Sequence, residues 1–465
     1  MVAGILIRAA ALPGPGTGDV TIWKIWSFNA ARHGVGELYG VGGVPLERRE
    51  LEYAGATAPV DYPPLALWEL GLAGQAYWTW SDRRFPNATP LNAFVKLPSV
   101  AAEIGVTLLL FALVRARLGV AVARLTAAAY WINPAALFDA SILGYLDAQY
   151  VLPAISALAA AVAGWPLAAG ALIAAAILTK AQGLFIAPAV AAAIWTTGAP
   201  ETRMTRLLAA IAGGLAVTIA VVAPVAAAGG WPNMLQALGR LATHDMLSAN
   251  AANLWWVIGY LLRVRYSVHD MGLWAAITAP AKILGIRRVI EIGYPDPRTI
   301  GIGLTTAAIG WALWTMRLGR RVSFDRAKTA AGCTPQPAPR TPHLEPDLWL
   351  LAGLAGFLVH AYATLSAQVH ENHLFAAVPL LVLAAAGRRG FRPIAAGVSM
   401  VVALNLNLFY GFGDGIGYAL PRAITIVDLT IIVALFNCFL LSWHAVVLSR
   451  QYSTAGALLP PPAPA

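Results

Sequence analysis

The chain has 465 residues, of which 58% are hydrophobic and only 12% are charged, and its mean hydropathy is +0.66. Apolar runs close to the ~20 residues needed to cross a bilayer recur along the chain, and this composition excludes a soluble globular protein. The formal net charge of +10 lies in short basic breaks between the runs, with no basic stripe on a polar domain, so nucleic-acid binding is excluded as well.

The apolar runs predict an all-α polytopic membrane protein with about twelve spanning helices, each satisfying its own backbone polar groups. They lie near residues 1–12, 93–114, 119–137, 148–163, 166–179, 183–197, 206–228, 299–316, 347–364, 373–387, 393–410 and 424–447. If the N-terminus is cytoplasmic, the arginine-rich breaks fall on the cytoplasmic side, as the positive-inside rule requires. The predicted location is therefore the cell (inner) membrane, as a multi-pass protein.

Two long segments, residues 13–92 and 229–298, are then expected on the outer side. In the first, apolar residues recur at helical spacing from Ile22 and predict a helix that lies in the membrane interface and ends at Gly34. A second such helix is predicted to begin at Pro63 and Pro64, because proline is well tolerated in a first helical turn.

The sequence also predicts how the membrane part is divided. Residues 318–346 shift abruptly to charge and proline, which indicates a cytoplasmic linker, and residues 451–465 have the composition of a disordered tail. The linker separates a front membrane module, residues 1–317, from a C-terminal transmembrane module, residues 347–450.

Several ionisable residues fall inside or beside the apolar runs. Arg8 and Glu103 are expected either to pair or to face a lipid-binding groove, and Lys96 is expected to snorkel to the interface. Lys180 lies between two short runs, where a helix break would set its ammonium near the outer interface, either snorkelling or paired with a lipid phosphate. Asp147 begins a span near the outer face and is a functional candidate, because charged residues within spans are costly.

Short motifs along the chain occur in an order that resembles one family. They are GDVTIWKIW at 18–26, ELYG at 37–40, DYPPL at 61–65, Asn133-Pro134 with GYLD at 144–147, TKAQG at 179–183, SANAANLWW at 248–256 and VHENH at 369–373. The chain resembles GT-C type integral-membrane glycosyltransferases, which use polyprenyl-phosphate sugars, over most of its length. VHENH is similar to the HE motif of bacterial mannosyltransferase-like members and of dolichol-phosphate-glucose-dependent glucosyltransferases.

The resemblance implies a GT-C bundle with interfacial helices in the first external loop. It also implies an inverting hexosyltransferase that moves mannose or glucose from a polyprenyl-phosphate carrier to an acceptor hydroxyl on the extracytoplasmic side. The acceptor would be a glycan, a glycolipid or a protein. Asp19 is implied to be the catalytic base. The implied substrate- and phosphate-binding residues are Lys180, His370, Glu371, Asp61, Tyr62, Asp147, Gln182 and Asn253.

The chemistry of the implied reaction needs little more than these groups. A sugar phosphate already carries a good leaving group, so one base suffices, and no metal or cofactor is expected. Val20 stands where many relatives have a second acid, and GYLD replaces the family's GQxD. His370 and His373 have a metal-like spacing, but no third ligand accompanies them.

Plainer structural roles compete with these assignments. Asp19 and Asp61 each precede a predicted helix, where an aspartate is a good N-cap. A set of four residues is expected either to stack on the sugar or to order the loop: Asn250, Asn253, Trp255 and Trp256. The alternative for the tryptophan pair is an anchor in the membrane interface.

Two other functions remain open from the sequence. A transporter or lipid-linked-glycan flippase would use the charged residues in the spans to line a passage, although it usually has broken helices and midplane charges in both halves. A non-catalytic scaffold would need no ordered polar set on one face.

Overall fold

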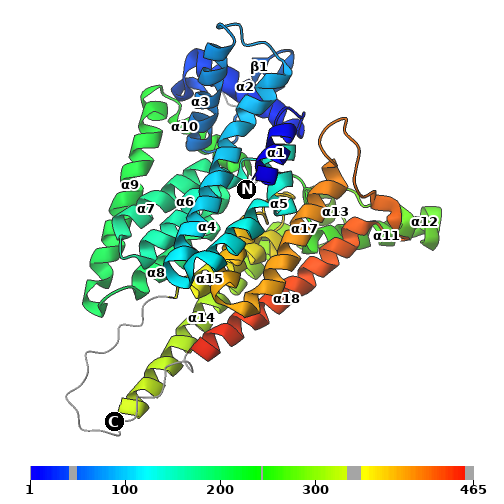
Figure 1. The fold of residues 1–465 in the computed structure, drawn as a ribbon. Helices are drawn as coiled ribbons and strands as arrows, with labels where there is room; N and C mark the ends of the chain where they lie inside the picture. The colour runs from blue at the N-terminus through cyan, green and yellow to red at the C-terminus, as the bar shows by residue number, and fades with distance from the viewer. Residues whose placement is uncertain (1, 41–49, 242–243, 332–346, 456–465) are drawn as a thin grey trace.

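The computed structural model describes the chain except residues 1, 41–49, 242–243, 332–346 and 456–465. In the described residues it contains eighteen α-helices and one short antiparallel hairpin, so the predicted all-α class is confirmed (Figure 1). The bundle occupies most of the molecule, and the first helices and the hairpin form a cap at one end.

The elements follow in four groups. The first group is α1 (Val2–Ala11), α2 (Gly18–His33), the 3-10 helix η1 (Val35–Glu37), β1 (Leu51–Tyr53), β2 (Ala56–Ala58) and α3 (Pro64–Trp80). The second is α4 (Thr89–Trp131), α5 (Pro134–Ala136), the π-helix η3 (Leu137–Leu143), α6 (Asp147–Val162), α7 (Pro166–Thr179), the 3-10 helix η4 (Ala181–Phe185), α8 (Ala187–Thr196), the 3-10 helix η5 (Pro200–Thr202) and α9 (Arg203–Ala227). The third is α10 (Trp231–Leu241), α11 (Leu254–Met271), α12 (Leu273–Thr278) and α13 (Ile286–Glu291). The fourth is α14 (Pro297–Ala331), α15 (Leu348–Leu365), α16 (Ala377–Gly387), the 3-10 helix η6 (Arg389–Phe391), α17 (Arg392–Tyr410), the 3-10 helix η7 (Arg422–Ile424) and α18 (Leu429–Ala455).

Six helical stretches in the described residues are long and apolar enough to cross a membrane, which indicates a multi-pass membrane protein. They are Thr89–Trp131, Pro200–Ala227, Pro297–Leu318, Leu348–Leu365, Arg389–Tyr410 and Leu429–Ser453. Two predicted spans, 93–114 and 119–137, both involve α4, which bends at Gly119, where φ is 81°. Several other predicted spans, such as 166–179, are apolar helices of 10–17 residues, so the number of spans beyond six stays a prediction.

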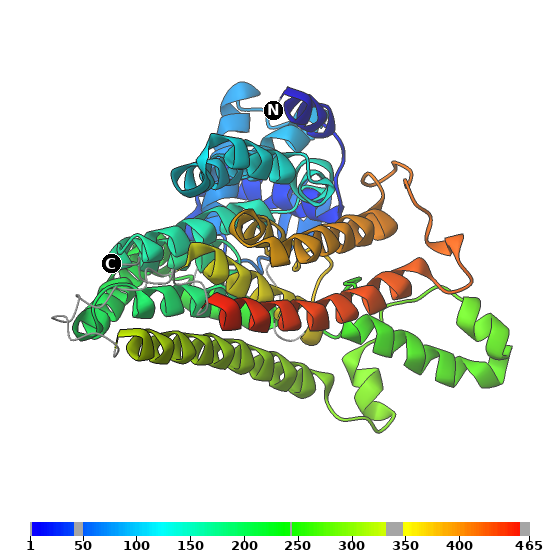
Figure 2. The same cartoon turned by 60° about the horizontal axis from the view of Figure 1, so that its bottom comes forward.

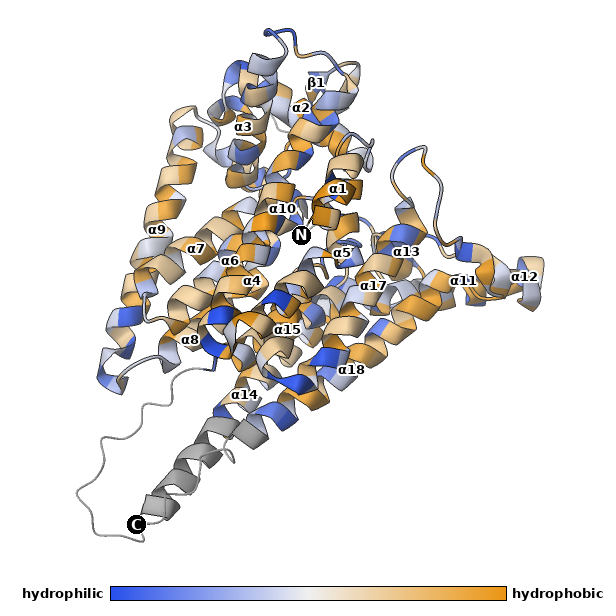
Figure 3. Ribbon diagram, in the orientation of Figure 1, coloured by the Kyte–Doolittle hydropathy of each residue, from blue (hydrophilic) through white to orange (hydrophobic). Residues whose placement is uncertain are grey.

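Hydrophobic residues dominate the helices of the bundle, and hydrophilic residues gather toward helix ends and in the cap (Figure 3). The main hydrophobic core includes residues of α4–α9 and α15–α18, and it is continuous because α16 packs on α4 and α15 packs on α6 and α8 (Figures 1 and 2). A second core lies in the cap between α2, α3 and the hairpin.

The predicted cap helices are confirmed, but their apolar faces are buried in protein. α2 ends at Gly34 and α3 has proline in its first turn, as predicted. Trp23 and Trp26 of α2 are each only 1% exposed because they pack in the second core. This face therefore packs against protein, and where the cap lies relative to a membrane stays a prediction.

The segment predicted as a linker, residues 318–346, starts inside α14, which continues to Ala331, and its part 332–346 lies outside the described residues. Likewise α18 extends to Ala455, into the predicted tail 451–465, whose part 456–465 lies outside the described residues.

Two buried cations have specific partners. Arg8 of α1 forms an ion pair with Glu103 of α4 at 2.7 Å, and its guanidinium lies 3.6 Å from the ring centroid of Trp131. One of the two expected alternatives for Arg8 and Glu103, pairing, is thus confirmed. The prediction that Lys96 snorkels is wrong, because its buried ammonium donates to the carbonyls of Gly14 and Ile142, each at 2.9 Å.

We expect Glu103→Leu to lower the free energy of unfolding by about 3–5 kcal/mol, because it leaves the buried Arg8 guanidinium without its counter-charge. The double variant Arg8→Leu/Glu103→Leu should recover most of this loss. Denaturant unfolding in detergent measures both, and Arg117→Ala, which removes an exposed arginine from the same helix, is the control. A double variant as unstable as the single one would contradict the prediction.

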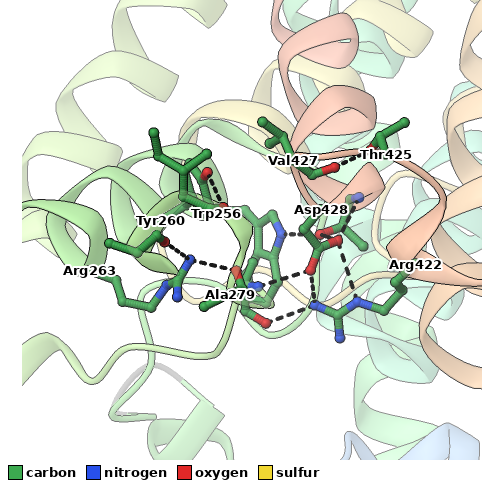
Figure 4. A network of polar contacts seen from close by, with 12 residues as sticks. Trp256, Tyr260, Arg263, Ala279, Arg422, Thr425, Val427 and Asp428 are labelled. Carbon is green, nitrogen blue, oxygen red and sulfur yellow. Dashed lines mark hydrogen bonds and ion pairs between the residues drawn. The ribbon is translucent and has the colours of Figure 1, made fainter. Parts of the chain in front are cut away.

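A polar cluster fastens the loop before α18 to the region around α11 (Figure 4). Asp428 accepts from Arg422 at 2.6 Å and from the Ala281 amide at 2.9 Å. The hydroxyl of Thr430 donates to Asp428 and accepts from the Trp256 indole, 2.9 Å away. The prediction that the tryptophan pair anchors the interface is therefore wrong: Trp255 and Trp256 are 4% and 3% exposed and order the loop, which was the alternative.

Candidate functional site

The start of α2 places Asp19 beside the turn that follows the π-helix η3. The Thr17 amide donates to the Leu143 carbonyl at 3.0 Å, and the Asp414 amide donates to the Gly16 carbonyl at 2.8 Å. The Trp23 indole donates to the Gly144 carbonyl at 2.9 Å. These contacts connect the base of α2 to two distant parts of the chain.

The N-cap alternative for both aspartates is wrong. The residue before α2 is Thr17, and Asp19 lies inside the first turn of the helix. α3 is preceded by Pro63, and no side chain caps it, so Asp61 is not its cap. Both carboxyls are therefore left for other roles.

A break between α7 and η4 places Lys180, as predicted, and gives it a protein partner. Its ammonium lies 2.8 and 2.9 Å from the two carboxylate oxygens of Asp147, and both side chains are buried. The Asn372 amide donates to the same carboxylate at 2.8 Å. The snorkelling alternative for Lys180 is thus wrong, and the sequence did not reveal that the acid and the lysine form a pair.

Gly144 allows the turn after η3 to lie close against α2. Its φ of 83° lies in the left-handed region, and a side chain at this position would collide with Val20 of α2. The hydroxyl of the next residue, Tyr145, donates to Glu371 at 2.5 Å. GYLD therefore supplies a contact between this turn and the VHENH segment.

The VHENH and SANAANLWW segments pair along their backbones. The Ala249 amide donates to the Val369 carbonyl at 2.9 Å, and bridges join Ala249 and Asn250 to His370. Asn250 also donates to the Tyr410 hydroxyl at 3.2 Å. Two motifs far apart in sequence thus form one wall of the site.

His373 has contacts that its sequence spacing did not indicate. Its two ring nitrogens lie 2.8 Å from the Gln182 amide nitrogen and 2.9 Å from the Tyr362 hydroxyl. Gln182 is therefore joined to the VHENH segment, next to Lys180. Within the part of the chain that the structure describes, no group of three or more His, Cys, Asp or Glu is placed to hold a metal ion.

The pKa of the Asp19 carboxyl is strongly perturbed. Burial, the largest cause, and the negative charge of Glu371 together raise the pKa of its carboxyl to about 7, while Lys180 opposes the shift. Asp61 and Asp147 also add to the increase. A group with this pKa suits a general base near neutral pH.

The surroundings of Asp19 contain further perturbed groups. Burial raises the pKa of Asp61, and the charges of His244 and Arg240 oppose that shift. Burial lowers the pKa of His370 to about 4, so its imidazole is neutral at neutral pH. His370 therefore can donate a hydrogen bond to a phosphate but cannot supply it with positive charge.

The predicted site residues divide into three sets. Asp19, Asp61, Asp147, Lys180 and Glu371 interact electrostatically, and Tyr62 packs its ring 5.1 and 5.5 Å from those of Trp23 and Trp26. His370 and Gln182 reach this group through the VHENH segment. Asn253 lies apart: it is fully buried and caps α11 by accepting from the Trp256 amide.

Sequence reasoning missed several groups around the site. Tyr145, Asn372 and Tyr410 contact predicted residues, and His244 and Arg240 act on Asp61. Tyr145 lies inside GYLD and Asn372 inside VHENH, so these motifs were a signal, and His244 lies in a polar pair with Asp245 that the sequence predicts on an outward loop; Tyr410 and Arg240 gave no signal.

No protein-family model and no curated protein matches this chain.

Proposed function

We propose that the chain is an inverting hexosyltransferase of the GT-C type, which moves a sugar such as mannose or glucose from a polyprenyl-phosphate carrier to an acceptor hydroxyl. The observation that supports this most is the convergence on Asp19. Five separate segments of the chain bring Asp19, the Asp147–Lys180 pair, Glu371 and Asp61 within electrostatic range of one another. The proposal includes a bundle of about twelve spans, with this site on the extracytoplasmic side.

In the proposed step, the Asp19 carboxylate takes the proton of the acceptor hydroxyl while that oxygen bonds to the anomeric carbon. The bond between that carbon and the carrier phosphate breaks at the same time, the electron pair leaves with the phosphate, and the configuration inverts. The phosphate is a good leaving group without protonation, so a second carboxyl acting as general acid is unnecessary.

Lys180 would stabilise the departing phosphate in this proposal. Its ammonium is shared with Asp147, so an incoming phosphate would bind to a cation that is already oriented. His370, neutral at neutral pH, would donate a hydrogen bond. Tyr62 and Asp61 lie on the cap side and would contact the sugar or the acceptor.

The function is tested by transfer of labelled hexose from a synthetic polyprenyl-phosphate donor in membranes that contain or lack the chain. A labelled product that appears only with the chain supports the proposal. The absence of product with every polyprenyl-phosphate hexose, despite a folded protein, would overturn it.

The pH dependence of transfer gives a specific expectation. Because the pKa of Asp19 is raised to about 7, its carboxyl stays protonated and inactive below that pH, so kcat/KM should rise as the pH increases through about 7. An exposed carboxyl would already be ionised at much lower pH. The profile of the Asp82→Asn variant, which changes an exposed acid, should be the same, and a flat profile across neutral pH would argue against Asp19 as the base.

A lipid-linked-glycan transporter is the second candidate, favoured by ionisable side chains buried inside helices, such as Glu103 and Lys96. The same labelled donor distinguishes the two functions. A transporter would move the intact lipid across a vesicle membrane without forming a new glycosidic product.

A further inference from the structure

Asp139 is a buried acid that the proposed reaction does not use. It lies in the π-helix η3, eight residues before Asp147, and its side chain is fully buried. Among the described residues, no amide, hydroxyl or cationic donor reaches either of its carboxyl oxygens. Such short π-helical segments are frequent at functional sites.

The group that Asp139 does meet is a second acid. Its carboxyl lies within hydrogen-bonding reach of that of Asp147, which accepts from Lys180 and Asn372. A hydrogen bond between two carboxyls requires a proton on one of them. Asp147 already has a full cation and an amide as donors, so the proton belongs on Asp139.

The charge count leads to the same assignment. Lys180 supplies one positive charge, and two ionised carboxylates side by side in a buried site would leave one uncompensated negative charge, which is costly. The other ionisable groups that act on Asp139 are Glu103 and Glu371, whose negative charges oppose its ionisation. Tyr130 and Tyr150, which also interact with it, are neutral phenols.

We propose that Asp139 is a neutral carboxylic acid that donates a hydrogen bond to Asp147 and thereby positions the Lys180 ammonium for the carrier phosphate. It is a positioning residue, since it touches Asp147 and acts on Lys180 only through that contact. The donated hydrogen bond withdraws electron density from Asp147, which weakens its hold on Lys180 and leaves more of the positive charge for a phosphate. The inference concerns Lys180 as a phosphate ligand and so rests on the proposed function.

A pair of variants tests this role. Asp139→Asn keeps a side-chain donor of nearly the same shape and should retain the donor KM and kcat of the unmodified protein. Asp139→Leu removes the donor, so Asp147 holds Lys180 more tightly, and the KM for the polyprenyl-phosphate hexose should rise about tenfold with a smaller change in kcat. If Asp139→Asn loses as much donor affinity as Asp139→Leu, an ionised carboxylate is required and the proposal is wrong.

Infrared spectroscopy tests the proton itself and needs no sugar transfer. In detergent without ester groups, at a pH well above the pKa of about 7 of Asp19, exposed carboxyls and Asp19 are ionised, and the carbonyl band of a protonated acid should remain. The difference spectrum between the unmodified protein and Asp139→Asn should contain this band, and the band should shift in D2O. An unchanged spectrum in Asp139→Asn would overturn the proposal, even if Asp139→Leu fails to fold. If the band is present but the unmodified protein transfers no sugar, only the glycosyltransferase function is overturned.

Discussion

Replacing Asp19 by asparagine is expected to reduce sugar transfer by about 10²- to 10⁴-fold, which is the usual contribution of a general base. The amide has nearly the same shape as the carboxyl but cannot accept the proton of the acceptor hydroxyl. The loss should appear as a lower kcat, because the interaction between Asp19 and the acceptor oxygen is strongest in the transition state, while the proton is being transferred.

Folding is expected to be unaffected by Asp19→Asn. Asp19 does not cap α2, whose start is held instead by backbone contacts of Gly16 and Thr17. Loss of negative charge among Glu371, Asp61 and Asp147 should, if anything, relieve repulsion. Asp82→Asn is the matched control and should keep full activity; a folded and fully active Asp19→Asn protein would show that Asp19 is not the base.

The second large effect is expected at Lys180. Lys180→Ala should raise the KM for the polyprenyl-phosphate donor by about 10- to 100-fold, since a hydrogen bond to a charged group is worth about 1.5–3 kcal/mol. The variant should also be less stable by about 3–5 kcal/mol, because Asp147 is left buried without its cation.

A double variant separates binding from stability. Lys180→Ala/Asp147→Asn removes both charges, so the free energy of unfolding should largely recover while the donor KM stays high. Lys282→Ala, which removes an exposed lysine, should change neither quantity. Full recovery of donor affinity in the double variant would mean that Lys180 only balances Asp147 and does not bind phosphate.

Local signals in the sequence predicted local structure well. Gly34 marked the end of α2, Pro63 and Pro64 the start of α3, and TKAQG the break that carries Lys180. Each of these depends on backbone preferences of a few neighbouring residues, which the sequence displays directly.

Partners of buried charges could not be predicted in the same way. Lys96 was expected to snorkel, yet it donates to the carbonyls of Gly14 and Ile142, because the turn after η3 and the start of the chain meet around it. The contact between Tyr145 and Glu371 joins residues that are 226 positions apart in the chain. Such contacts follow from the packing of helices that are distant in sequence, so the spacing of residues along the chain does not predict them.

The contacts of Gly16 and Thr17 with Asp414 and Leu143 restrict which segments of this chain can be exchanged with those of a related protein. The backbone just before Asp19 is hydrogen-bonded to the loop that contains Asp414 as well as to the end of η3. In a chimaera that exchanges the N-terminal segment alone, the residues around Asp19 would come from one parent and the loop 411–415 that binds them from the other. Segments 13–26 and 411–415 are therefore expected to tolerate exchange only when both come from the same parent.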